Sequence, residues 1–184
     1  FSKRLSLNGF KRQRQTDASL IRIYFRYICV QNRSMYTEYQ PSHLLVPYID
    51  SYWEFKGNPD YGMRIHILPD GCTDFIFTLG EVANAVEEGS LIMQPYRSYF
   101  VGPMTKYSEL VTYTESIHMF GVRFLPCGLS CFTNLPLHEF VNSRVSTNEM
   151  KAVFDDTFIE KLGEQKHVTD RIRVCLLYTS PSPR

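Results

Sequence analysis

Short runs of alternating apolar and polar residues dominate the chain between residues 51 and 124. In an extended strand such alternation sends successive side chains to opposite faces, so each run predicts a β-strand. The predicted strands are 64–68 (RIHIL), 73–79 (TDFIFTL), 97–102 (RSYFVG), 109–115 (ELVTYTE) and 117–124 (IHMFGVRF), with 51–55 (SYWEF) as a weaker sixth. Several short strands in succession, with no helical pattern between them, favour a β-barrel or a β-sandwich.

The segment LPDG lies between two of these strands and carries a turn signature. Pro69 fixes φ, the Asp70 carboxylate can accept a nearby backbone N–H, and Gly71 tolerates positive φ. We therefore predict that these three residues form a hairpin turn joining the strands at 64–68 and 73–79.

His66, Cys72 and Asp74 flank this turn and raise the question of a metal or catalytic site. Alternation places Cys72 and Asp74 on one face of their strand, and His66 can lie across from one of them. No second histidine lies nearby in the sequence. We favour the structural interpretation, predict no metal ion, and expect Asp74→Asn and Cys72→Ser to cost much less stability than Gly71→Val.

Helical signals precede and follow the predicted strands. Ser42 can cap a short helix at 42–49. The residues that this helix would turn towards a core are Leu44, Leu45, Tyr48 and Ile49.

A longer amphipathic helix is predicted at about 147–162. Ser146 and Glu149 have capping-box spacing, and the apolar face that follows includes Met150, Phe154 and Phe158. The simpler interpretation is that this face packs on its own domain. The alternative is that Met150, Phe154 and Phe158 form the contact of a homodimer.

Composition fits one globular domain with a core, because 43% of the 184 residues are hydrophobic. The patterns together predict a mainly β fold with C-terminal helices, which is an α+β class. We divide the chain into a basic extension (1–34), a β-barrel domain (35–142), a helical linker or dimerisation segment (143–173) and a Ser/Pro-rich tail that resembles non-native sequence (174–184).

Charge is distributed unevenly along the chain. Residues 1–34 carry net +7, and the whole chain carries +1, which leaves −6 on residues 35–184. A domain that grips nucleic acid clusters Lys and Arg against phosphates, so an acidic body is a poor candidate for that task.

Cysteine usage and hydropathy favour the cytoplasm. The five cysteines show no repeated CxxC spacing, which fits reduced thiols better than a disulfide framework. Cys127 and Cys131 lack the two further ligands that a structural zinc site needs, so we predict no cofactor. The apolar run near residue 25 is short and contains Arg22 and Arg26, so it suits neither a membrane span nor a signal peptide.

Four blocks, in order and spacing, resemble the N-terminal sensor domain of AraC-type bacterial transcriptional regulators. They are YIDSYWEFKG, ILPDGCTDFIF, FVGPMTKYS and FGVRFLPCGLSCFTNLPLHEFVN, and the resemblance covers about 36–162. Cys127 departs from the pattern, which usually has a small residue there. The resemblance implies a cupin-like antiparallel barrel that senses a small molecule or mediates dimerisation. It also implies a DNA-binding region with two helix-turn-helix motifs beyond the segment present here.

Six residues are candidates for binding an unknown small-molecule effector, because pockets combine apolar walls with a few polar groups. They are Trp53, Arg64, His66, Phe77, Tyr99 and Arg123. Each also has a structural interpretation: the aromatic residues as core, Arg64 and His66 as a solvated strand face, and Arg123 as the partner of Glu54, Asp74 or Glu115.

No local motif combines a nucleophile with a base and an orienting group, so we predict that the chain is not an enzyme. The resulting expectation is a sensor and dimerisation domain that contacts DNA only through a C-terminal domain. A stand-alone cupin-like small-molecule-binding protein or enzyme is the alternative.

Overall fold

The computed structural model describes residues 35–67, 69–80, 85–87, 93–147 and 156–179. These ranges form antiparallel β-sheets followed by two α-helices, so the predicted α+β class is confirmed. No helix in the described ranges has the length and apolar character needed to cross a bilayer.

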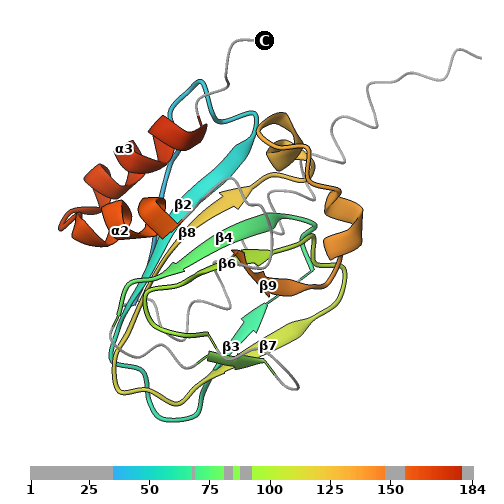
Figure 1. The fold of residues 1–184 in the computed structure, drawn as a ribbon. Coiled ribbons are helices and arrows are strands. Elements are labelled where there is room, and N and C mark those ends of the chain that lie inside the picture. Colours follow the sequence, from blue (N-terminus) through green and yellow to red (C-terminus); the bar gives the residue numbers. More distant parts are fainter. Residues whose placement is uncertain (1–34, 68, 81–84, 88–92, 148–155, 180–184) are drawn as a thin grey trace, which may run out of the picture.

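The strands form two sheets (Figure 1). The larger has the order β1 (Tyr36–Tyr39), β2 (Ile49–Gly57), β8 (Ile117–Phe124), β4 (Thr73–Thr78), β6 (Ser98–Val101) and β9 (Arg144–Ser146). The smaller has the order β3 (Met63–Ile67), β7 (Ser108–Thr112) and β5 (Ala85–Glu87). The helical elements are the short 3-10 helices η2 (Gly128–Cys131) and η3 (Leu137–Phe140) and the α-helices α2 (Asp156–Glu164) and α3 (Val168–Thr179).

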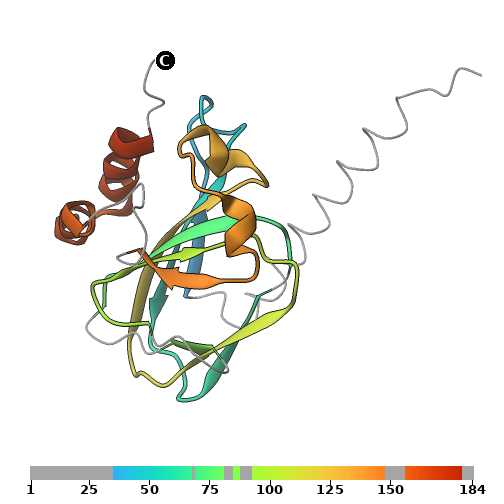
Figure 2. The same ribbon diagram turned by 45° about the vertical axis from the view of Figure 1, so that its right-hand side comes forward.

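The larger sheet is covered on both faces, which makes the molecule three layers deep. Helices α2 and α3 lie beside β2 and β8, and the smaller sheet lies away from them (Figures 1 and 2). Strand β4 therefore has no solvent face, and all its residues are buried. Phe75 and Phe77 join the core on the helix side, whereas Ile76 joins a second core between the sheets.

Helices α2 and α3 are held on the larger sheet by apolar packing and by one polar cluster. Phe158 of α2 is fully buried, with its ring centroid 5.1 Å from that of Phe77. Arg171 of α3 donates to Glu54 Oε1 of β2 at 2.6 Å, and Nε2 of His118 on β8 lies 2.8 Å from the same oxygen. The pKa of Glu54 is lowered, chiefly by the hydrogen bond with His118 and against the effect of burial.

Five predicted strands are confirmed as β3, β4, β6, β7 and β8, and the weak sixth becomes β2, the longest strand among the described residues. Strands β1, β5 and β9 were not predicted. Each is short and pairs with a single neighbour at the end of its sheet. A short edge strand needs few apolar side chains, so the alternation of apolar and polar residues in its sequence is weak.

The predicted LPDG hairpin is wrong, although its local turn geometry is confirmed. Strand β3 pairs with β7, whereas β4 pairs with β6 and β8, so this segment carries the chain from the smaller sheet to the larger one. Gly71 has φ +71°, and Asp70 Oδ1 accepts the Cys72 N–H at 2.9 Å. Turn residues specify a change of direction, but they do not specify which strands pair.

The predicted helix at 42–49 is replaced by turns that lead into β2. Carbonyl oxygens of Ser42 and Leu45 accept turn hydrogen bonds, but no regular helix forms, and Pro47 cannot supply a helical N–H. Leu45 and Ile49 are buried as expected, whereas Leu44 is 71% exposed.

Only the C-terminal part of the predicted helix at 147–162 lies within the described residues. Ser146 pairs with Tyr99 at the end of β9, and the described helix α2 begins at Asp156. Glu149, Met150 and Phe154 lie outside the described residues. Phe158, expected as either a core or a dimer residue, is a core residue within this chain.

Two structural elements extend across the segment boundaries that we drew from the sequence. Strand β9 extends the larger sheet past residue 142, and α3 continues past 174 with Cys175 fully buried. The two sheets pack face to face through their shared core, and neither closes on itself. The described chain is thus a two-sheet structure with helices on one outer face.

Gly71→Val should lower the free energy of unfolding by roughly 1–3 kcal/mol, because a β-branched residue is strained at positive φ. A Cβ at this position would meet only Pro126 Cγ at 3.8 Å, an ordinary contact, so the loss is conformational. Gly71→Asn is the control, since Asn tolerates this region better. Urea unfolding of both variants is the measurement, and equal losses would contradict the turn assignment.

Phe158→Ala should lower the free energy of unfolding by about 3–5 kcal/mol, the usual cost of deleting a buried ring. Thr157→Ala, on the exposed side of α2, should cost far less. Denaturation and sedimentation of both variants separate the alternatives. Unchanged stability with loss of self-association would show that Phe158 serves a partner instead.

Candidate functional site

A cavity lies between the two sheets, with a volume of about 90 Å³. This space exceeds what a single buried water needs, roughly 10–15 Å³, so it can hold a small organic molecule. Its apolar lining comes from both sheets and the connecting segments: Phe55, Ile65, Ile67, Ile76, Val101, Met104, Leu110 and Met119. Its aromatic and polar lining consists of Tyr36, Trp53, Arg64, His66, Asp70, Cys72, Asp74, Arg123 and Arg144.

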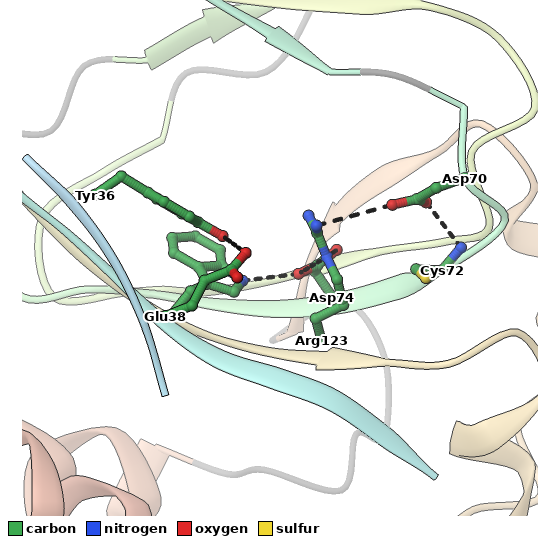
Figure 3. A network of polar contacts seen from close by, with 7 residues as sticks. Tyr36, Glu38, Asp70, Cys72, Asp74 and Arg123 are labelled. Carbon is green, nitrogen blue, oxygen red and sulfur yellow. Dashed lines mark hydrogen bonds and ion pairs between the residues drawn. The ribbon is translucent and has the colours of Figure 1, made fainter. Parts of the chain in front are cut away.

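Three neighbouring strands bring Trp53, Asp74 and Arg123 together at one wall. In the ladders, Arg123 of β8 lies opposite Asp74 of β4, and Trp53 of β2 lies opposite Gly121. Arg123 Nε lies 3.2 Å from both carboxylate oxygens of Asp74, and Trp53 Nε1 donates to Asp74 Oδ1 at 2.8 Å. Figure 3 shows Asp74 beside Arg123, with Arg123 also directed towards Asp70.

Gly121 permits the position of the Trp53 ring. A Cβ at Gly121 would overlap the indole atoms of Trp53, so the ring lies directly on the β8 backbone. From there the indole N–H reaches Asp74. The glycine in the middle of this strand therefore marks a close approach between a side chain and the backbone, as strand glycines often do.

Burial and charge act in opposite directions on the Asp74–Arg123 pair. Burial favours a lower pKa for Arg123, but the facing carboxylates, Asp74 foremost, outweigh it, so its pKa is raised and the guanidinium stays charged. Burial raises the pKa of Asp74, while Arg123 and the Trp53 N–H oppose that rise. Asp70 adds a second carboxylate 3.8 Å from Arg123 Nη1.

The thiol of Cys72 also lines the cavity, on the same side as Asp74, as the alternation predicted. Its pKa is raised, mainly by burial and then by Asp70. A nucleophilic or metal-binding cysteine needs a thiolate, which this environment disfavours. Among the described residues, no group of three or more His, Cys, Asp or Glu side chains is arranged to hold a metal ion.

Arg64 and His66 line the outer part of the cavity from β3, and both contact Glu109 of β7. Arg64 Nη1 donates to Glu109 Oε2 at 2.5 Å, and His66 Nδ1 lies 3.0 Å from Glu109 Oε1. Tyr107 joins the cluster through His66 and by donating to Glu109 Oε1 at 2.9 Å. The Arg64 side chain is 64% exposed, which agrees with the solvated strand face considered from the sequence.

The structure brings four of the six predicted binding residues to the cavity: Trp53, Arg64, His66 and Arg123. Phe77 does not line it, because alternation along β4 turns this ring into the core beneath the helices. Tyr99 is buried between the sheets but does not line the cavity, and its hydroxyl accepts the Gln94 N–H at 2.6 Å. Of the carboxylates considered for Arg123, Asp74 is the partner found.

Sequence reasoning missed two polar residues of the lining. Tyr36 comes from β1, and Arg144 comes from β9. Both are edge strands that the alternation did not reveal, so no signal placed these side chains near the cavity. Tyr36 donates to Glu38 Oε1 at 2.9 Å, and Arg144 Nη2 donates to Ser108 Oγ at 2.8 Å.

The sequence led us to expect that Asp74→Asn costs little stability, but the burial of Asp74 predicts a large cost instead. Removing one member of a buried ion pair leaves the other charge buried, so Asp74→Asn should lower the free energy of unfolding by about 3 kcal/mol or more. The double variant Asp74→Asn/Arg123→Met should lose no more than the single one, and Cys72→Ser should lose less. Urea unfolding measures all three. A larger loss in the double variant would contradict the explanation that the unpaired charge of Arg123 causes the loss in Asp74→Asn.

The chain matches the family described as Domain of unknown function (DUF6597) over residues 37–146. This segment runs from the second residue of β1 to the end of β9, and it contains every residue of both sheets and of the cavity lining except Tyr36. No curated protein matches the chain. Because the matched segment is more than half of the 184 residues, the chain belongs to the DUF6597 family.

Proposed function

We propose that this chain is the small-molecule sensor domain of a cytoplasmic AraC-type transcriptional regulator, and that its effector binds in the cavity between the two sheets. The observation that carries the binding step is the cavity itself, with a buried Arg123 held in place by Asp74. Apolar walls with a few fixed polar groups are typical of small-molecule sites. The face-to-face sheets are compatible with a cupin-like arrangement.

The chemistry of the lining favours binding over catalysis. Asp74 is engaged by Arg123 and Trp53, which leaves it poorly placed to transfer a proton to a substrate. The Cys72 thiol has a raised pKa, which disfavours a nucleophilic thiolate. A catalytic site needs a nucleophile or base within reach of an activating group, and these two residues do not form such a pair.

The regulatory part of the proposal comes from the four sequence blocks that resemble AraC-type sensor domains. The net charge of −6 on residues 35–184 agrees with DNA contact through a separate C-terminal domain. Self-association as a homodimer belongs to the same proposal. A stand-alone cupin-like binding protein is the alternative, and the reading frame in the source genome distinguishes them. A downstream region with two helix-turn-helix motifs supports the regulator, and a natural stop codon after the helices supports the alternative.

Binding can be followed through Trp53, because it is the chain's single tryptophan and lines the cavity. A library of small metabolites should contain compounds that change Trp53 emission saturably and raise the melting temperature. Val101→Phe, which adds bulk to the cavity wall, should weaken this binding at least about tenfold. Val145→Phe, at the helix-side core, is the matched control and should retain it. Equal binding by both variants, or no binding compound at all, would contradict the proposed site.

A further inference from the structure

We propose, on the basis of the binding function above, that the cavity selects ligands with an apolar body and a hydrogen-bond-accepting oxygen, and that it rejects alkylammonium compounds. The selection comes from how the polar groups of the lining are already used. Three guanidinium groups line the cavity against two carboxylates, and both carboxylates are engaged by the protein.

Guanidinium groups dominate the polar lining, and they can only donate hydrogen bonds. Arg123 enters from β8 in the middle of the larger sheet, and Arg144 enters from β9 at its edge. Arg144 also donates to Ser108 on the strand β7, so it spans from one sheet to the other beside the cavity. Each guanidinium carries five N–H groups, so a ligand oxygen can share donors with the protein partners of these side chains.

The carboxylates facing the same space are engaged by protein donors. Asp74 accepts from Trp53 Nε1 and Arg123 Nε. Asp70 accepts the Cys72 N–H through Oδ1, and its Oδ2 faces Arg123. An ammonium group entering the cavity would have to share these carboxylate oxygens with the protein donors that already contact them.

Trp53 keeps this arrangement rigid. Its ring lies on Gly121, which fixes the indole N–H at Asp74. Asp74 in turn orients the Arg123 guanidinium through both carboxylate oxygens. Because each group is held by the next, the donors of Arg123 are preorganised before a ligand arrives.

Charge does not decide between a neutral carbonyl and a carboxylate. The two positive charges of Arg123 and Arg144 are balanced by the two negative charges of Asp70 and Asp74 in the lining. The charge of Arg64 is balanced by Glu109, which lies just outside the lining. The surroundings are therefore close to neutral. The feature shared by both ligand types is an oxygen acceptor, and the test separates them.

The test uses three probes with similar alkyl bodies: hexanoate, 2-hexanone and hexylammonium. Titrations followed by Trp53 emission and by melting temperature give the affinity of each for the full chain. A buried donor or charge left without a partner costs at least about 1.4 kcal/mol, which is tenfold in affinity. We expect hexylammonium to bind at least about tenfold more weakly than the tighter oxygen probe, and the ratio of hexanoate to 2-hexanone reports whether the ligand is anionic or neutral.

Arg144→Gln supplies the variant, because its half-buried position at a sheet edge tolerates the change better than the buried Arg123 does. The variant should weaken the oxygen probes and leave hexylammonium unchanged. Arg173→Gln removes the same charge from an exposed site on α3, with its side chain 77% exposed, and should change neither.

Hexylammonium binding as tightly as the oxygen probes would overturn this inference and leave the proposed binding function intact. Equal effects of Arg144→Gln and Arg173→Gln would also overturn it. If none of the three probes binds, the metabolites found through Trp53 emission decide: acceptor-bearing compounds support the inference, and cationic ones overturn it. Failure of every compound would overturn the binding function as well.

Discussion

Strand β4 is covered on both faces, so Asp74, its one charged residue, has to be neutralised inside the protein. The neighbouring strand β8 supplies Arg123 directly opposite in the ladder, and β2 supplies the indole N–H of Trp53. This buried group ties together three adjacent strands in the middle of the larger sheet. Since these residues also line the cavity, the polar character of the candidate site follows from how the sheet neutralises its buried charge.

The two faces of the larger sheet pack against different elements. One face packs Phe77 and Phe120 against α2 and α3, and it contains no cavity wall group. The other face packs against the smaller sheet and leaves the cavity beside the buried ion pair. Trp53 and Glu54, adjacent on β2, show the division: Trp53 lines the cavity, and Glu54 binds Arg171 of α3. A single sheet thus separates the candidate site from the helices.

Alternation in the sequence predicted the central strands and the shared side of Cys72 and Asp74, because period-2 patterns report directly on side-chain faces. The mixture of aromatic and polar residue types pointed to four cavity residues, whereas Phe77 takes the core position that was its alternative interpretation. Strand pairing is decided by contacts far apart in the chain, so LPDG was assigned to a hairpin although it connects two sheets. Arg144 could not be found because its short edge strand has too few residues to show a pattern.

The central proposal is that a small molecule with an accepting oxygen occupies the space between the two sheets. An experimental structure of the full chain with its tightest-binding compound tests this most directly. The account predicts the compound between the sheets, with an oxygen within hydrogen-bond distance of Arg123 or Arg144 and its apolar part against residues such as Met119 and Leu110. A compound bound on the outer surface, with the cavity filled by side chains, would contradict it.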